Sequence, residues 1–115
     1  MNITTTIRPD GVAVLAANGR INLVTAPTVR REVQRVVDEG HARLAFDLSE
    51  VEFIDSSGLG ALVSGLKTAR TVGGDLRLAA ATEQVASVLR LTNLDRILRV
   101  YPASDDAYRD DAYRD

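Results

Sequence analysis

Short apolar runs alternate with stretches of helical spacing along this chain. Residues 3–7 and 12–17 read as two short strands, and Pro, Asp and Gly at positions 9–11 predict a turn that joins them as a hairpin. From about Thr25 to Glu39, valines recur on one helical face, which predicts an amphipathic helix. Gly40 is expected to end that helix.

The second half of the chain continues the alternation of strand and helix. A helix from Ser56 to about Val72 is followed by two glycines, and Thr82 has the residue type of an N-cap for another helix. Because strands that alternate with helices need crossover connections, the sheet should contain parallel pairs, and the predicted fold class is α/β. The other elements expected here are strands at 42–48, 76–80 and 97–101 and a short final helix after Pro102.

The length of 115 residues suits one domain, which we place at residues 1–105. The pentapeptide DAYRD occupies positions 106–110 and is repeated at 111–115. Chain ends without apolar periodicity usually stay loose. Residues 106–115 are therefore interpreted as a solvated tail or as the end of the last helix.

Composition argues against several classes of function. A net charge of −2 disfavours direct DNA binding, since surfaces that bind nucleic acid are usually strongly basic. No stretch approaches the roughly 18 apolar residues that span a bilayer, so we expect no membrane insertion and a cytoplasmic location. The chain has no cysteine and a single histidine, His41, which disfavours a zinc site. Neither a metal nor a cofactor is expected.

The junction around Asp55 is the candidate site, because the pattern changes there from strand to helix. Asp, Ser and Gly are typical of a helix N-terminus, where their side chains serve unpaired amide groups. Ser56 and Ser57 place two hydroxyl groups at this junction, and the helix dipole favours a phosphate there. From the residue types alone, a helix cap is the simpler interpretation.

The sequence IDSSGLG at 54–60, followed by an amphipathic helix, two glycines and the apolar run 76–78, resembles the phosphorylation segment of anti-sigma factor antagonists of the STAS domain family. The similarity extends over most of the chain and includes Thr25, Ala26 and Pro27 at the start of the first helix. It implies a single STAS domain with a mixed β-sheet, an N-terminal hairpin and about four α-helices.

The resemblance also implies a regulatory binding protein. In this family, the unphosphorylated form binds an anti-sigma factor that has serine kinase activity and so releases a sigma factor that activates transcription. Phosphorylation ends that binding, and a PPM-type serine phosphatase restores it. Ser56 stands at the family's phosphorylated position, although spacing alone leaves Ser57 as a competitor. The partner-binding residues implied by the resemblance are Asp55, Ser56, Ser57, Gly58, Leu59, Gly60, Arg20, Asn22 and Thr25.

Arg20 and Asn22 depart from the family's pattern, since both stand where acidic residues are usual. Their loop is less negative as a result, which bears on which kinase is recognised and on how strongly phosphoserine is repelled. The alternative is that the loop simply keeps its shape, because Asn also favours turns. The departure concerns the identity of the partner more than the fold.

Two other functions fit the sequence less well. A STAS subunit of a transporter or of a larger signalling assembly would share the fold, but the isolated length and the intact DSSG segment favour the regulatory switch. A serine hydrolase needs a base beside its nucleophile, yet the GxSxG pattern is absent and His41 is placed in a loop. We therefore do not expect an enzyme.

Overall fold

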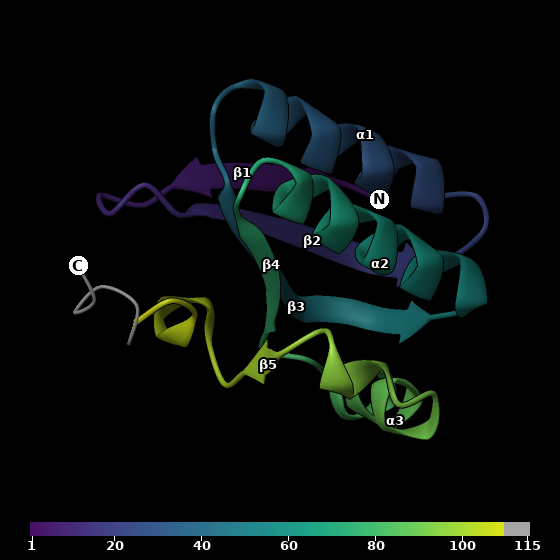
Figure 1. Cartoon of the computed structure of the whole chain (residues 1–115). Coiled ribbons are helices and arrows are strands. Elements are labelled where there is room, and N and C mark those ends of the chain that lie inside the picture. The colour runs from purple at the N-terminus through teal and green to yellow at the C-terminus, as the bar shows by residue number, and fades with distance from the viewer. Residues whose placement is uncertain (110–115) are drawn as a thin grey trace.

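The computed structural model describes residues 1–109, which form one five-stranded sheet flanked by helices (Figure 1). The first two strands pair antiparallel and every later pair is parallel, so the predicted α/β class and the N-terminal hairpin are confirmed. Across the sheet lie, in chain order, β1 (Ile3–Ile7), β2 (Ala13–Ile21), β3 (Arg43–Ile54), β4 (Asp75–Ala79) and β5 (Val100–Tyr101).

Three α-helices make the connections between the parallel strands. They are α1 (Ala26–Asp38), α2 (Ser56–Thr71) and α3 (Glu83–Leu91), and short 3-10 helices follow at Leu94–Arg96 and Ser104–Asp106. In residues 1–109, the number of helices is therefore close to the predicted number of about four. α1 and α2 lie side by side on one face of the sheet, and α3 lies on the other side (Figure 1). No helix in the described part of the chain combines the length and apolar character needed to cross a membrane.

An aliphatic core fills the space between the sheet and the layer formed by α1 and α2. The predicted inner face of α1 is buried, and it consists of Val29, Val33, Val36 and Val37. Gly65 of α2 lies so close to its neighbours that a Cβ there would stand 3.0 Å from Leu76 Cδ1 and 3.4 Å from Val33 Cγ2. The absence of a side chain at Gly65 therefore lets α2 pack tightly against both α1 and β4.

β2 continues further than the sequence predicts. A strand ending at Ala17 was expected, but β2 pairs with β3 as far as Ile21. The register shifts on either side of Asn18 and Gly19 each leave one extra residue on β3, so β3 is irregular there while β2 continues. Gly19 has a φ of +86°, a conformation that glycine adopts readily. The extension places Arg20 in the sheet rather than in a loop.

β5 is shorter than the strand predicted at 97–101 and contains only Val100 and Tyr101. The preceding residues continue a helical turn, since the backbone N–H of Leu98 donates to the Leu94 carbonyl at 2.8 Å. Leu98 is fully buried, so this apolar residue packs in the core without pairing in the sheet.

Ala107 and Tyr108 of the first DAYRD copy pack into the domain, so the interpretation of residues 106–115 as a solvated tail does not hold for these two residues. Ala107 and Tyr108 are buried, with 0% and 1% of their surface exposed. The Tyr108 hydroxyl accepts from the Leu44 backbone N–H at 3.1 Å and lies 2.7 Å from the Leu44 carbonyl and 2.8 Å from that of Asp75. The packed domain therefore extends through Tyr108 rather than ending at 105. Asp110, which ends the first copy, and the second copy at 111–115 lie outside the described residues.

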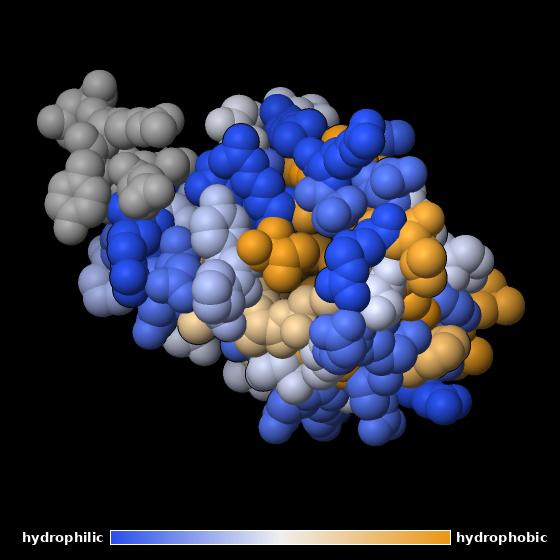
Figure 2. Space-filling view, turned by 90° about the horizontal axis from the view of Figure 1, so that it is seen from below, coloured by the Kyte–Doolittle hydropathy of each residue, from blue (hydrophilic) through white to orange (hydrophobic). Residues whose placement is uncertain are grey.

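The side of the molecule turned away from α1 and α2 has a mixed surface. Figure 2 shows it from below, with apolar side chains in separate patches among hydrophilic ones. Small exposed apolar patches are ordinary on soluble domains. This face shows no continuous apolar band.

Candidate functional site

The predicted site lies at the carboxyl ends of two neighbouring parallel strands, β2 and β3. β3 ends at Ile54, and α2 begins two residues later at Ser56. The intervening residue, Asp55, donates its backbone N–H to the carbonyl of Ile21, the last residue of β2, at 3.2 Å. This hydrogen bond ties the start of α2 to the end of β2. Ligand and partner sites of α/β folds are commonly formed at this edge of the sheet.

Asp55 is the N-cap of α2. Its backbone is extended, and its carboxylate accepts a hydrogen bond from the backbone N–H of Gly58 at 3.0 Å. One of the unpaired amides at the helix start is satisfied in this way. The structure therefore shows the Asp55 carboxylate accepting a helix amide, the role that its residue type predicts. Asp55 directly precedes Ser56 in the sequence.

The two serines differ in their exposure, which the sequence could not show. Ser56 is exposed at the first position of α2, whereas Ser57 is partly buried. Neither hydroxyl forms a hydrogen bond with any residue in the range 1–109. Ser56 is thus the more accessible nucleophile of the pair, and its hydroxyl is not engaged in capping the helix.

Gly58 is required by the packing of the helix start. A Cβ at this position would stand 2.3 Å from the Ile21 carbonyl oxygen and 2.7 Å from Ile54 Cγ1. Real Cβ atoms essentially never come so close to other atoms. Leu59 is buried in the core, and Gly60 is exposed on the outer side of the helix. Within the predicted partner-binding segment, Gly58 and Leu59 therefore support the fold, while Ser56 and Gly60 face outward.

The loop between β2 and α1 is held by its own side chains. The Asn22 side-chain oxygen accepts from the backbone N–H groups of Val24 at 3.0 Å and Thr25 at 3.2 Å. The Thr25 hydroxyl accepts from the Asn22 N–H at 2.9 Å and donates to the Arg20 carbonyl at 2.7 Å. A carboxylate at position 22 would accept the same bonds. The amide oxygen of Asn22 thus stabilises the turn by accepting backbone hydrogen bonds, as Asn side chains commonly do in turns.

Arg20 lies on the sheet surface beside this loop. Its guanidinium group stacks 5.1 Å from the centre of the Phe53 ring, and the side chain is exposed. A shallow surface hollow is lined by Arg20, Asn22 and Thr25 together with Glu50 and Glu52. The structure thus brings the three predicted loop residues together and places acidic side chains of β3 beside the arginine.

Two exposed apolar residues of this loop were not predicted as part of the site. Leu23 is 74% exposed and Val24 is 82% exposed. Two adjacent aliphatic side chains at the tip of a loop are available for contact with another surface. The sequence signal that indicates them is an apolar pair inside a turn.

A second hollow adjoins Ser56 along α2. Its lining residues come from α2 and from the 3-10 helix after α3, and they are Ser56, Leu59, Gly60, Val63, Ser64, Lys67 and Leu94. Leu94 is far from Ser56 in the sequence and was not predicted to approach it. Among these lining residues, Lys67 is the one with an ionisable side chain, so this surface carries a positive charge.

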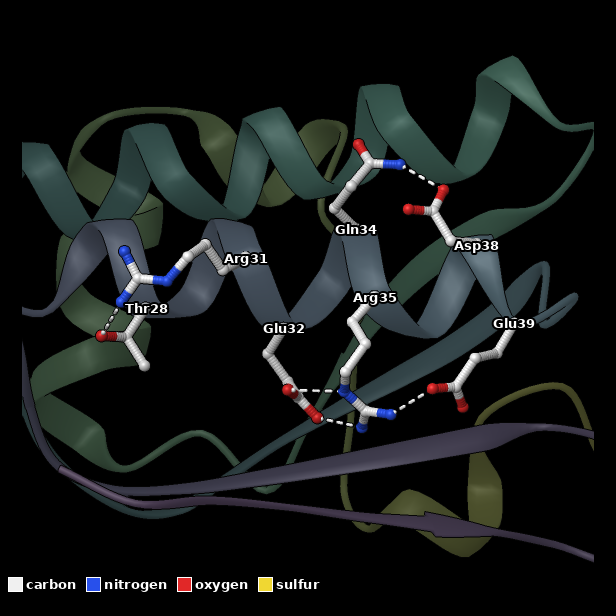
Figure 3. Close-up of a pocket in the computed structure, with 7 residues that line it drawn as sticks. All are labelled: Thr28, Arg31, Glu32, Gln34, Arg35, Asp38 and Glu39. Carbon is white, nitrogen blue, oxygen red and sulfur yellow. Dashed lines mark hydrogen bonds and ion pairs between the residues drawn. The ribbon is translucent and has the colours of Figure 1, made fainter.

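A third hollow lies on the outer face of α1, away from the serine junction (Figure 3). Arg35 there bridges Glu32 and Glu39, with distances of 2.5 and 2.6 Å. The hydrogen bond from Arg35, which outweighs partial burial, lowers the pKa of Glu32 below its ordinary value. The dashed contacts in Figure 3 join Arg35 to Glu32 and Glu39, Arg31 to Thr28, and Gln34 to Asp38. Each charged group therefore has a polar partner, and this surface has the character of a solvated helix face.

Comparisons with known proteins agree with this geometry. The family model of the STAS domain matches residues 4–107. The anti-sigma-F factor antagonist RsfB of Mycobacterium tuberculosis is 32% identical over 109 residues, which cover 92% of this chain and 87% of RsfB. The crystal structure of an anti-sigma factor antagonist from Mycobacterium paratuberculosis is 35% identical, with a TM-score of 0.79 and coverage of 99% of this chain and 96% of that chain.

A more distant structure shows the same fold. The anti-sigma factor antagonist SpoIIAA in its unphosphorylated form has a TM-score of 0.80 and covers 99% of this chain and 100% of its own, at 15% identity. With a family model that matches nearly the whole described domain, and relatives above 30% identity along most of their length, this chain belongs to the STAS domain family.

Proposed function

We propose that this protein is an anti-sigma factor antagonist that is switched off by phosphorylation of Ser56. The unphosphorylated form binds an anti-sigma factor with serine kinase activity, and a sigma factor is released to activate transcription. The observation that carries the proposal is the exposed, unbonded Ser56 hydroxyl at the start of α2. The relatives named as anti-sigma factor antagonists support it.

The partner is proposed to cover the edge of the sheet where α1 and α2 begin. Leu23 and Val24 supply exposed apolar surface, and Ser56 and Gly60 supply an outer helix face with little side-chain bulk. Arg20 and Asn22 lie beside this surface. Because Asn22 maintains the structure of the loop, we propose that the departure from the family's acidic pattern changes partner binding through charge. Arg20 would then select a partner with a complementary carboxylate.

Phosphorylation is proposed to act on binding and to leave the fold intact. A phosphate adds roughly −1.5 to −2 charges. The helix dipole and the amides at the start of α2 favour a negative charge there, so the domain stays folded. A partner that covers Ser56 must instead desolvate the phosphate. A loss of about 3 kcal/mol from this effect lowers the affinity roughly 100-fold.

The chain is the substrate in this reaction. A bond forms between the Ser56 oxygen and the γ-phosphorus of ATP, the bond from that phosphorus to the β-phosphate oxygen breaks, and ADP leaves. The hydroxyl proton passes to a base of the kinase, which also binds the magnesium and the ATP. A PPM-type phosphatase hydrolyses the phosphoserine. We place this cycle in the cytoplasm and ascribe to this chain neither DNA binding nor membrane insertion.

The test is to incubate the chain with ATP, magnesium and each candidate anti-sigma kinase of the same genome, and to measure the intact mass and the phosphosite. We expect one added phosphate on the wild type and on Ser57→Ala, and none on Ser56→Ala. The phosphorylated chain should then lose binding to the same kinase in a pull-down, whereas Ser56→Ala should remain bound. Phosphate on Ser57, or unchanged binding after modification of Ser56, would overturn the proposal.

A further inference from the structure

Arg30 of α1 has no ionic partner of its own in the described part of the chain. The side chain is exposed, and no hydrogen bond or ion pair of its guanidinium group is present among residues 1–109. Neighbouring arginines of the same helix are engaged, since Arg31 donates to the Thr28 hydroxyl at 3.2 Å and Arg35 binds two glutamates. The guanidinium of Arg30 is therefore free to bind an anion.

The position of Arg30 is beside the helix face that carries Ser56. Its Nη2 atom lies 3.6 Å from the point where a Cβ on Gly60 would stand. Gly60 follows Ser56 by four residues, so both lie on one face of α2, with Cβ positions about 5–6 Å apart. Both also line the same surface hollow. Because residue 60 has no side chain, nothing from that position fills the space between Arg30 and the serine.

We propose that Arg30 binds the phosphate of phosphorylated Ser56 and donates hydrogen bonds to its oxygens across Gly60. This inference rests on the proposed phosphorylation of Ser56 and adds which residue binds the phosphate in the modified form. The planar guanidinium group of arginine matches phosphate oxygens well. The arginine side chain is long enough to span one helical turn, and the phosphate extends the short serine side chain towards it.

The other charged groups around the serine do not replace Arg30. Lys67 lines the same hollow but is eleven residues further along α2, which places it about 16 Å away along the helix axis. The Asp55 carboxylate is directed to the Gly58 amide. The structure places the Arg30 guanidinium beside Gly60, on the face of α2 that also carries Ser56.

The regulatory consequence is a change of two surface groups at once. In the unphosphorylated chain, a neutral serine and a free arginine face a partner. After modification, the arginine is bound to the phosphate and is no longer available to a carboxylate of that partner. Phosphorylation would then both add a negative group to the interface and withdraw a positive one.

The test does not require a kinase. Phosphoserine is incorporated at position 56 during translation of the full chain, and the ³¹P chemical shift is followed against pH. The second pKa of a phosphate is about 6. Arg30→Gln should raise it by about 0.5, because a nearby positive charge is lost. Arg31→Gln removes the same charge from the next residue of α1 and should leave the phosphate pKa unchanged.

Equal pKa values for Arg30→Gln and the unsubstituted phosphoprotein would overturn the proposal, as would equal shifts in the Arg30 and Arg31 variants. Thermal melting of each chain without phosphate shows that the variants fold. Since the phosphate is installed directly, failure here leaves the phosphorylation by a kinase untouched. Conversely, a kinase that does not modify Ser56 leaves the Arg30 contact measurable.

Discussion

Replacing Gly58 by alanine should destabilise the protein, although alanine is the better helix former. The added methyl carbon would stand 2.3 Å from the Ile21 carbonyl oxygen and 2.7 Å from Ile54 Cγ1, and neither neighbour is the free end of a flexible side chain. Overpacking of this kind costs about 1–3 kcal/mol. The Ile21 carbonyl also accepts the Asp55 N–H, so a displacement weakens that hydrogen bond too.

Helix propensity offsets part of this cost, because alanine is favoured over glycine in a helix by about 0.5–1 kcal/mol. A net loss of about 1–2 kcal/mol is therefore expected for Gly58→Ala. Urea unfolding followed by circular dichroism measures it, provided that the m-value is unchanged. The midpoint should move to lower urea concentration.

Gly60→Ala is the matched control, since it makes the same chemical change two residues later in the same helix. Its Cβ would meet only the Arg30 Nη2 atom, at 3.6 Å, which is ordinary van der Waals contact. With no overpacking, the propensity gain remains and the variant should be more stable by about 0.5–1 kcal/mol. Equal effects of the two substitutions, or a stabilising Gly58→Ala, would refute the argument that packing against β2 requires a glycine.

Further predictions concern the N-cap of α2 and the buried Tyr108. Asp55→Ala should cost about 0.5–2 kcal/mol through loss of the N-cap of α2, and Asp55→Asn, which keeps an acceptor, should recover most of it in the same unfolding experiment. Tyr108→Phe removes the partner of the buried Leu44 N–H and should cost about 1–3 kcal/mol. Burial, followed by the nearby charge of Asp75, raises the pKa of Tyr108 above its ordinary value of 10.0. The folded state therefore favours the neutral phenol, and this contribution is present below about pH 10 and is lost as the pH rises further. Stability of the wild type should fall more steeply above pH 10 than that of Tyr108→Phe, and parallel pH profiles would contradict this account.

Much of the fold was predictable because local signals and burial agree. The valines of α1 repeat at helical spacing and are buried, and Thr82 caps α3 by accepting from the Val85 N–H at 3.4 Å. The end of the second strand was predicted too early, because Asn18 and Gly19 have residue types typical of a turn, and the pattern alone does not separate a turn from a continuing strand. What distinguishes them is pairing with β3, which is a property of the assembled sheet.

The location of the candidate site was predictable from the sequence, but which of its residues are exposed and which support the fold was not. Asp55 as a cap follows from residue type. The greater exposure of Ser56 over Ser57 depends on how α2 is placed against Ile21, and the approach of Arg30 to Gly60 depends on the packing of two helices. Tyr108 was missed because its partners, Leu44 and Asp75, lie 64 and 33 residues away. Periodicity within one segment carries no information on such contacts.

The buried Tyr108 also determines where the gene can be cut for protein production. A chain ending at residue 105, the boundary that composition favours, would lack the ring that covers Val12 and Ala45 and would leave the Leu44 amide without its acceptor. Affinity tags and fluorescent fusions for partner screens should therefore be joined beyond Arg109. A binding defect seen with a shorter chain would report on an incomplete core rather than on Ser56.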